Sequence, residues 1–263
     1  ITPPIFIDSP ADITIDCSSL SDYTFTPTAN DNCSVNITFA YTDTEITGVG
    51  NNSVITRVWT ATDDNNNITA YTQTITVADT TAPTFTISPA DITVECDAST
   101  LPADTNGPAT ASDNCDSDVT VSYADTTVPG VGNNSVITRV WTATDDNSNE
   151  TNYTQTITVV DTTAPVFIDS PADITVECDA STLPADTNGP ATASDNCDSD
   201  VTVSYADTTV PGVGNNSVIT RVWTATDDNS NETNYTQTIT VVDTTAPVFI
   251  CLLYTSPSPR DRG

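Results

Sequence analysis

The chain of 263 residues carries 36 acidic side chains but only five basic ones, all arginine, and no His, which gives a formal net charge of −31. A surface this acidic excludes nucleic acid and anionic membranes as partners, because both need a basic footprint on the protein. Without His or Lys, a Ser-His-Asp or Cys-His catalytic arrangement cannot form, and no carboxylate pair is marked as acid–base machinery. The chain is therefore predicted not to be an enzyme.

The apolar residues follow a regular pattern. They make up 37% of the chain and alternate with polar ones, which is not typical of a disordered acidic segment. No apolar run approaches the roughly 20 residues that span a bilayer, so no membrane insertion is expected in this segment. No signal peptide is visible and the first residue is Ile1, so we expect the chain to begin inside a longer protein.

An internal repeat organises the sequence. The motif DTTAP recurs with a period of 82 residues, and residues 88–168 are identical to residues 170–250. The first repeat is a diverged copy, about three residues shorter. The predicted domains are repeat 1 at 1–79, repeat 2 at 80–161, repeat 3 at 162–243, and the start of a truncated fourth repeat at 244–250.

The sequence departs abruptly from this pattern after Ile250. Where the repeat predicts DSPADITVEC, the chain reads CLLYTSPSPRDRG. This tail, residues 251–263, resembles a translated transposase-type sequencing adapter, so we expect it to be non-native and exclude it, with Cys251, from the fold. Six cysteines and three arginines remain, two cysteines and one arginine in each repeat.

Period-2 alternation of Thr, Val, Ile and Tyr predicts strands within each repeat. In the third repeat these strands cover, in chain order, residues 173–178, 201–205, 218–227 and 234–242. The segments between them are rich in the turn residues Gly, Pro, Asn and Asp. About seven short strands in roughly 80 residues predict an all-β fold of tandem immunoglobulin-like antiparallel β-sandwich domains in an extended array.

One long strand contains the repeat's only tryptophan and its only arginine. Trp223 and Ala225 share a face that we expect to be core, because they alternate with threonines. Arg221 has the same parity as these two residues. This parity does not resolve where Arg221 lies, and we expect it at the end of the sheet.

The cysteines predict disulfides. Their even number and regular positions indicate an oxidising compartment and hence an extracellular or cell-surface location. The two cysteines of each repeat lie fewer than 20 residues apart, and a domain this small gains from a crosslink. A thiolate zinc site is disfavoured because no His is present. We therefore expect one disulfide within each repeat: Cys17–Cys33, Cys96–Cys115 and Cys178–Cys197.

The segments DNC, VWTATDDNSNET and TQTITVVDTTAP of the third repeat resemble hyalin-repeat (HYR) and related immunoglobulin-like modules. The resemblance covers all three repeats, with one departure: DDNSN stands where the family usually has GN after TATD. Modules of this kind are strung along large secreted and surface proteins, including adhesins of Bacteroidota-like bacteria. The resemblance implies an adhesion or spacer role and identifies no ligand.

Calcium is the ion that the loops favour. Ca²⁺ takes hard oxygen ligands, and Asp and Asn recur at alternate positions of the DDNSN and DNCDSD turns. The alternative is that these are solvated turns, because Asp and Asn are common turn residues and the EF-hand pattern is absent. No other cofactor is expected. The candidate ligands are Asp113, Asp116, Asp118, Asp145, Asn147, Asn149, Asp161, Asp195, Asp198, Asp200, Asp227, Asn229 and Asn231.

The expected function is that of a non-catalytic, semi-rigid stalk or spacer in a cell-surface, adhesin-like protein. The DTTAP linker leaves little slack between repeats, and its Pro restricts the backbone. The identity of repeats 2 and 3 argues against a specialised site in either, so an extracellular protein or glycan is expected to bind through domains outside this segment. The alternatives are a calcium-dependent adhesion module and accessory repeats of a larger secreted hydrolase.

Overall fold

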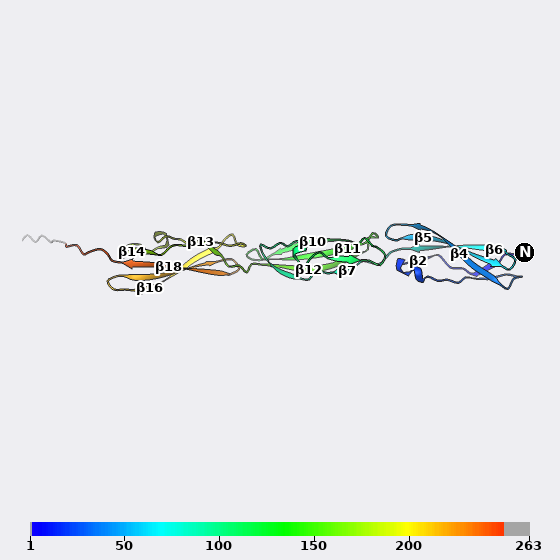
Figure 1. Cartoon of the computed structure of the whole chain (residues 1–263), viewed down its shortest axis with the longest axis horizontal. Coiled ribbons are helices and arrows are strands. Elements are labelled where there is room, and N and C mark those ends of the chain that lie inside the picture. The colour runs from blue at the N-terminus through cyan, green and yellow to red at the C-terminus, as the bar shows by residue number, and fades with distance from the viewer. Residues whose placement is uncertain (1, 250–263) are drawn as a thin grey trace, which may run out of the picture. The chain divides into compact units, whose positions relative to one another are not determined.

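The computed structural model describes residues 2–249, so the predicted adapter-like tail and Cys251 lie outside the described residues. Each repeat contains six strands in the same order, and many of them are labelled in Figure 1. The strands of repeat 1 are β1 (Ile5–Asp8), β2 (Ile13–Ile15), β3 (Thr28–Asn30), β4 (Ile37–Thr47), β5 (Ser53–Asp63) and β6 (Ile68–Val77). Those of repeat 2 are β7 (Thr84–Ile87), β8 (Ile92–Glu95), β9 (Thr110–Ser112), β10 (Thr120–Pro129), β11 (Ser135–Thr144) and β12 (Glu150–Val160). Those of repeat 3 are β13 (Val166–Asp169), β14 (Ile174–Glu177), β15 (Thr192–Ser194), β16 (Thr202–Pro211), β17 (Ser217–Thr226) and β18 (Glu232–Val242).

Every repeat builds one four-stranded and one two-stranded sheet. In repeat 1 the larger sheet has the order β2-β6-β5-β4, and β1 pairs with β3 in the smaller one. The all-β prediction of tandem sandwich units is confirmed. Two details differ from it: six strands form in each repeat rather than about seven, and β2 runs parallel to β6 while the other pairs are antiparallel. A short 3₁₀ helix follows the second strand of each repeat: η1 (Cys17–Asp22), η2 (Pro102–Asp104) and η3 (Pro184–Asp186).

By contacts, the described chain divides into two compact units. The first holds repeats 1 and 2 up to Val160, except for Val131–Asn133 at the tip of the β10–β11 hairpin. The second holds these three residues together with the chain from Asp161 onward. The predicted boundaries at 79, 161 and 243 all fall between strands.

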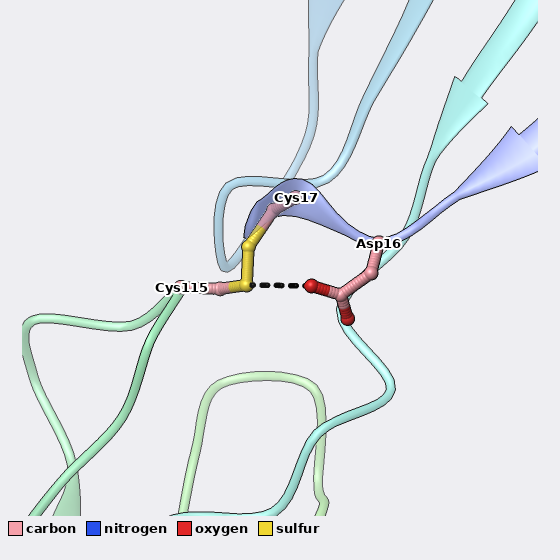
Figure 2. A group of neighbouring side chains, drawn as sticks. All are labelled: Asp16, Cys17 and Cys115. Carbon is pink, nitrogen blue, oxygen red and sulfur yellow. Dashed lines mark hydrogen bonds between the residues drawn. A yellow bond between two sulfur atoms is a disulfide. The ribbon is translucent and has the colours of Figure 1, made fainter. Parts of the chain in front are cut away.

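The disulfide pairing is a correction to the sequence analysis. Cys17 is bonded to Cys115 of the next repeat, with the two Cα atoms 6.0 Å apart (Figure 2). Cys33 and Cys178 are free and exposed, whereas Cys96 and Cys197 are disulfide-bonded. All three predicted pairs, Cys17–Cys33, Cys96–Cys115 and Cys178–Cys197, are therefore wrong.

Strand direction explains the error. Cys17 follows β2, whose last residue pairs with Val77 at the end of β6. Cys33 follows β3 at the opposite end, where β6 begins and Ser34 Oγ donates to Asp64 at 3.1 Å. The ten residues of β6 separate the two ends by roughly 33 Å at about 3.3 Å per residue. A disulfide needs Cα atoms within about 7 Å, so closeness in sequence gave the wrong partner.

The core lies on the inner face of the large sheet. In repeat 3, Ile219, Ile239 and Val241 form a buried cluster against which Ile174 and Val176 pack. Trp223 and Ala225 are buried on the same face of β17, as predicted from the alternation. Burying a large apolar side chain stabilises the fold by about 1.5–3 kcal/mol, so the few residues of this face provide most of the apolar stabilisation.

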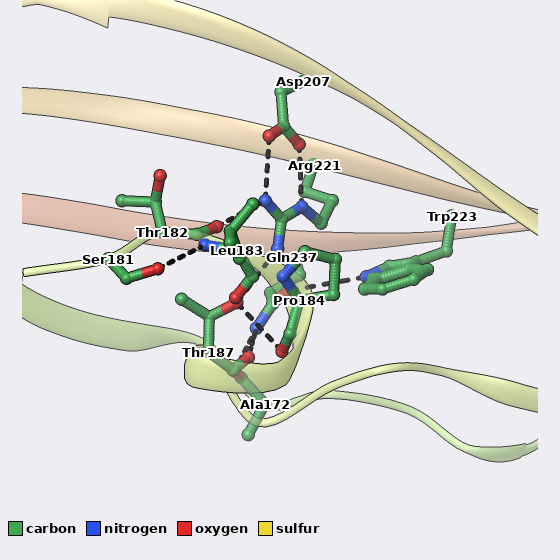
Figure 3. Close-up of polar contacts among 10 residues, drawn as sticks. All are labelled: Ala172, Ser181, Thr182, Leu183, Pro184, Thr187, Asp207, Arg221, Trp223 and Gln237. Carbon is green, nitrogen blue, oxygen red and sulfur yellow. Dashed lines mark hydrogen bonds and ion pairs between the residues drawn. The ribbon is translucent and has the colours of Figure 1, made fainter.

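Arg221 is not at the sheet end but within the core, with 1% of its surface exposed. It lies on β17 opposite Asp207 of β16, and its Nε and Nη2 donate to the two carboxylate oxygens, each at 2.8 Å (Figure 3). Nη1 donates to the Thr187 hydroxyl at 2.9 Å, and Nη2 also donates to the Thr182 carbonyl at 2.6 Å. A buried guanidinium is tolerated here because each of its three nitrogens donates to an acceptor.

The arginine network fastens the loop of the repeat onto its sheet. Gln237, which is fully buried on β18, accepts from Trp223 Nε1 at 3.4 Å. It donates to the carbonyls of Thr187 at 2.6 Å and Ala172 at 3.0 Å. The hydrogen bond with Asp207 raises the pKa of Arg221 above its ordinary value, so this cation persists at every working pH.

Repeat 1 retains the ion pair without the loop contacts. Its shorter loop supplies Tyr23, whose hydroxyl accepts from Gln73 Nε2 at 2.7 Å. Arg57 pairs with Asp43 at 2.8 Å, and its side chain is 12% exposed. The equivalent arginine therefore has two environments among the three repeats. The loop contacts it in some repeats, and in repeat 1 the loop does not contact it.

Replacing Arg221 by Met should cost more stability than replacing Arg57 by Met. The first change leaves Asp207 and two loop acceptors without a donor inside the protein, which we expect to cost about 3 kcal/mol, near the low end for a broken buried pair because Asp207 is 31% exposed. The second removes a more exposed pair and should cost about 1 kcal/mol. Urea unfolding followed by tryptophan fluorescence measures both. Equal shifts in the unfolding midpoint would contradict the role given to the loop contacts.

Candidate functional site

The end of repeat 1 that faces the linker presents a hairpin tip and a cysteine. The tip joins β4 to β5 through Gly50 and Asn51, both left-handed with φ of 61° and 58°. Glycine and asparagine tolerate this conformation better than other residues. A Cβ on Gly50 would lie 2.7 Å from Asn147 Nδ2 of repeat 2, so the close approach of the next repeat also requires glycine here.

Repeat 2 meets this end with two turns that are fixed by their own aspartates. Asp113 Oδ1 accepts from the backbone N–H of Cys115 at 2.8 Å, which holds the DNC turn. Asp145 Oδ1 accepts from the backbone N–H groups of Asn147 and Asn149 at 2.9 and 2.8 Å, which holds the turn between β11 and β12. Side-chain acceptors of this kind specify the turn locally, so both loops are shaped within the repeat.

Amide side chains join the two repeats around the disulfide. Asn52 Nδ2 donates to Asn147 Oδ1 at 2.7 Å, and Asn147 Nδ2 donates to the carbonyl of Gly50 at 3.1 Å and to Asp79 Oδ2 at 3.2 Å. Asn51 Nδ2 donates to the Cys115 carbonyl. The linker belongs to the same network, because Asn52 Oδ1 accepts from the backbone N–H of Asp79 at 2.8 Å. The junction is therefore held by one covalent bond and several hydrogen bonds from both sides.

Asp16 lies beside the disulfide. Its Oδ1 is 3.7 Å from Cys115 Sγ (Figure 2), and Asn114 Nδ2 donates to Asp16 at 3.3 Å and to Cys115 Sγ at 2.9 Å. Hydrogen bonds from the hydroxyl and then the backbone of Ser18 lower the pKa of Asp16 below its ordinary value of 3.8. Because the folded value is lowered, this contribution to stability is present above pH 3.8 and is lost as the pH falls through the folded pKa.

The asparagines of the predicted calcium set serve mainly as donors. Asn149 Nδ2 donates to Asp145 at 2.8 Å and to the Asp79 carbonyl at 3.3 Å. Asp116 accepts from the backbone N–H of Asp118 and of Asp146, each at 2.8 Å, which shapes the turn. The structure therefore does not bring the thirteen predicted ligands into one site. The equivalent positions in repeat 3, including Asn229, Asn231, Asp198 and Asp200, make the corresponding turn contacts.

Three of the predicted aspartates do converge in the second unit. Asp161, Asp195 and Asp227 each offer a carboxylate oxygen, and these atoms lie within 4.8 Å of one another. Asp161 and Asp227 are 5% and 6% exposed. Asp195 Oδ2 is buried with no hydrogen-bond partner among the described residues. Carboxylates this close repel each other, so the cluster has the donor type and the uncompensated charge that suit a divalent cation.

The hairpin-tip residues Gly50, Asn51 and Asn52 were not among the site residues predicted from the sequence. The repeat itself held a signal, because the motif GVGNNS recurs in all three repeats, whereas an ordinary turn needs no fixed sequence. The second unit contains the same type of contact. Asn133 Nδ2 donates to the Cys197 carbonyl, and Asn229 Nδ2 donates to the Gly132 carbonyl at 3.0 Å.

Tandem β-sandwich repeats of this kind, crosslinked by disulfides, form a class of extracellular modules. Residues 166–241 match the family model described as an HYR-like domain with 4 cysteines, so the third repeat is an HYR-like domain. Residues 88–159 have the same sequence as residues 170–241, so the second repeat is one as well. The matched region holds two cysteines, Cys178 and Cys197, where the family description has four.

No curated protein matches the chain in sequence. Among solved structures it is similar to Drosophila N-cadherin EC1-4, at 14% identity and a TM-score of 0.32 over 92% of this chain and 76% of that one. It is also similar to the protocadherin GammaB4 extracellular domain, at 14% identity and a TM-score of 0.33 over 91% of this chain and 49% of that one. These scores are too low to transfer any residue or role. Among the described residues, no helix is long and apolar enough to span a membrane.

Replacing Cys115 by Ser should destabilise the chain, whereas replacing Cys33 by Ser should not. The Cys17–Cys115 bond spans 98 residues, and closing a loop of about 100 residues stabilises by up to about 4.7 kcal/mol on the chain-entropy model. Cys33 occupies the same turn position in repeat 1 and is free, which makes it a matched control. Thermal melts of the two variants measure the difference, and non-reducing peptide mapping identifies the partner of Cys17. A peptide that links Cys17 to Cys33 would overturn the pairing.

Proposed function

We propose that the chain is a non-catalytic, semi-rigid spacer of an extracellular surface protein, in which neighbouring repeats are fixed to one another. The observation that carries this proposal is the junction between repeats 1 and 2. A disulfide between Cys17 and Cys115 crosses it, and Asn51, Asn52 and Asn147 hydrogen-bond across it. A linker with no other support would leave the repeats free to swing, so a crosslink in addition to the linker points to a mechanical role.

The negative charge of the repeats explains why the junction between them needs to be fixed. The third repeat contains thirteen acidic residues and one arginine, so adjacent repeats repel each other at neutral pH. Repulsion keeps an array soluble, but it also opposes close packing at the joint. A covalent bond and neutral amide contacts hold the junction without requiring opposite charges.

The hollows beside the hairpin tips of repeats 1 and 2 are consistent with a non-catalytic role. The cavity at the base of the β4–β5 hairpin is about 290 Å³ and is lined by Ile, Val, Thr, Ala, Ser, Gly and Asn, with no ionisable side chain. The corresponding hollow in repeat 2 has the same character. Neither offers an ionisable side chain that could act as a general acid or base for its hydroxyl groups. HYR-like repeats acting as adhesion-type modules are consistent with this surface.

If the junction is stiff, removing its crosslink should shorten the molecule in solution. Small-angle X-ray scattering of the oxidised chain, compared with a Cys17→Ser/Cys115→Ser variant, measures the maximum dimension and the flexibility. We expect a smaller average dimension and a more flexible profile for the variant, because the joint then samples bent arrangements. A Cys33→Ser/Cys178→Ser variant is the matched control, since it removes two thiols that carry no bond. Identical profiles for all three proteins would reject the spacer role.

A second candidate function is calcium-dependent adhesion, favoured by the cluster of Asp161, Asp195 and Asp227. The buried, unpartnered oxygen of Asp195 is the specific observation, because an oxygen removed from water without a donor is costly unless a cation or proton meets it. A bound ion would compensate the three carboxylates and add to the rigidity of the second unit. This candidate and the spacer role are compatible.

If this cluster binds calcium, adding CaCl₂ should raise the melting temperature. Saturation at 100 times the dissociation constant stabilises the folded state by about 2.7 kcal/mol by mass action. Asp195→Asn should abolish the shift while keeping the Oδ1 acceptor for the N–H of Cys197. Asp200→Asn, an equal charge change at an exposed residue outside the cluster, should leave the shift unchanged. Equal melts in calcium and in chelator would exclude the site.

A further inference from the structure

We propose that carboxylates placed around the disulfide between repeats 1 and 2 protect this bond from reduction by anionic thiols such as glutathione. The bond joins Cys17 to Cys115. A disulfide is uncharged, so neighbouring carboxylates do not oppose it once it has formed. Its reduction begins when a thiolate attacks one of the two sulfurs, and the negative charge then spreads over the reacting sulfurs. Carboxylates beside the bond therefore oppose its cleavage while leaving the oxidised junction undisturbed.

Asp16 supplies the first of these carboxylates. Its Oδ1 is 3.7 Å from Cys115 Sγ (Figure 2), and a carboxylate oxygen of Asp16 and the two sulfurs lie within 4.8 Å of one another. Ser18 holds Asp16 in place, because its hydroxyl and its backbone N–H donate to Asp16 Oδ1 at 2.6 and 3.0 Å. The same hydrogen bonds lower the pKa of Asp16, so this group carries its charge at neutral pH.

Two further carboxylates approach Cys115, one from the linker and one from the DNC turn. An oxygen of Asp79 and an oxygen of Asp113 lie within 4.8 Å of Cys115 Sγ. Asp113 Oδ2 is buried and has no hydrogen-bond partner among the described residues, so no donor there offsets its charge. Asn114 acts in the opposite direction, because its Nδ2 donates to Cys115 Sγ at 2.9 Å and would stabilise a thiolate at this sulfur. One neutral amide faces three carboxylates, so repulsion prevails.

Burial decides which sulfur is attacked. Cys115 is 3% exposed, whereas Cys17 is partly exposed, so a thiolate from solution reaches Cys17 Sγ. It forms a mixed disulfide with Cys17, the Sγ–Sγ bond breaks, and Cys115 leaves as a thiolate. A second small thiolate attacks the small-molecule sulfur of the mixed disulfide and releases Cys17. The two small thiols give two electrons to the protein and form their own disulfide. The first step places the new charge on Cys115, which is the sulfur that lies beside the three carboxylates.

The charge of the attacking thiol decides how strongly these carboxylates act. A glutathione thiolate is repelled as it approaches Cys17 and again as charge moves to Cys115. Cysteamine carries an ammonium group, which offsets the charge of its thiolate during the approach. The net charge of −31 also repels anions at long range, but salt screens that repulsion beyond about 10 Å at 0.1 M. The three carboxylates lie well within this distance, so their effect remains at physiological ionic strength.

Asp16→Asn should make the disulfide easier to reduce. Asparagine has nearly the same shape and keeps an Oδ1 acceptor for Ser18, but it removes the charge. We expect reduction by glutathione to become about tenfold faster, equivalent to about 1.4 kcal/mol. Reduction by cysteamine should become only about threefold faster, because its ammonium group already offsets part of the repulsion.

The reduction is measured on the full chain with Cys33→Ser, Cys178→Ser and Cys251→Ser, so that the four remaining cysteines are all disulfide-bonded at the start. The reactions are run at 0.15 M salt and stopped with N-ethylmaleimide at a series of times. Mass spectrometry of the digested protein then counts the labelled Cys17 and Cys115 peptides.

Two controls separate charge from loosening of the junction. Asp64→Asn makes the same change in net charge at the opposite end of repeat 1, where Asp64 accepts from Ser34, and should leave the rate unchanged. Cys96 is also disulfide-bonded but follows β8 at the other end of repeat 2, where Glu95 pairs with Val160. Its labelling in the same samples should not respond to Asp16→Asn.

Equal rates for Asp16→Asn and Asp64→Asn with glutathione would overturn the proposal. Equal acceleration of Asp16→Asn with glutathione and with cysteamine would also overturn it, since a loosened junction exposes the bond to both thiols alike. The chain with Asp16 in place gives a second measurement. Its ratio of cysteamine rate to glutathione rate, per thiolate, should exceed that of the uncharged bis(2-hydroxyethyl) disulfide by about threefold or more, and equal ratios would contradict the protection.

This inference goes beyond the proposed spacer function, because it concerns how the bond is cleaved and not how the joint moves. Faster reduction of Asp16→Asn by glutathione, together with a scattering profile that is unaffected by Cys17→Ser/Cys115→Ser, would keep the protection and reject the stiff spacer. A stiff junction together with equal reduction rates would do the reverse.

Discussion

The parallel pairing of β2 with β6 is the constraint on which the rest of the structure depends. Because the two strands run the same way, the end of β2 emerges beside the end of β6, where the linker leaves the repeat. Cys17 is therefore placed at the exit of its repeat, and the DNC turn, which follows β3, at the entrance. An antiparallel β2 would have brought both cysteines to one end and allowed the disulfide within the repeat. One strand direction thus decides that the Cys17–Cys115 crosslink runs between repeats.

A small core depends on polar groups as much as on apolar ones. In repeats 2 and 3 the inner face of the large sheet carries a few aliphatic side chains, and an arginine and a glutamine occupy buried positions beside the tryptophan. The loop that covers these polar groups supplies hydrogen-bond partners, as Thr182 and Thr187 do for Arg221. A buried network is favourable only when complete. The loop is therefore part of the core, and its shorter form in repeat 1 leaves Arg57 more exposed.

Features that depend on a local pattern of residues could be predicted from the sequence. Features that depend on how the strands pair and align could not. Alternation identified the strands and the buried face of Trp223 and Ala225, because a period of two follows from strand geometry alone. Arg221 was misplaced because its partner, Asp207, is recognised only once β16 and β17 are aligned. The cysteine pairing failed for the same reason. The calcium ligands stay a prediction: Asp161, Asp195 and Asp227 converge, whereas other candidates, such as Asp113 and Asp116, shape turns by accepting from backbone N–H groups.

The place of the crosslink decides which parts of the chain it stabilises. At the junction of repeats 1 and 2, Cys17 at the exit of one repeat is bonded to Cys115 at the entrance of the next. A crosslink inside each repeat would stabilise the repeats singly. The crosslink between repeats instead makes the stability of each joint part of the folding of both neighbours, which is the property that a load-transmitting spacer requires.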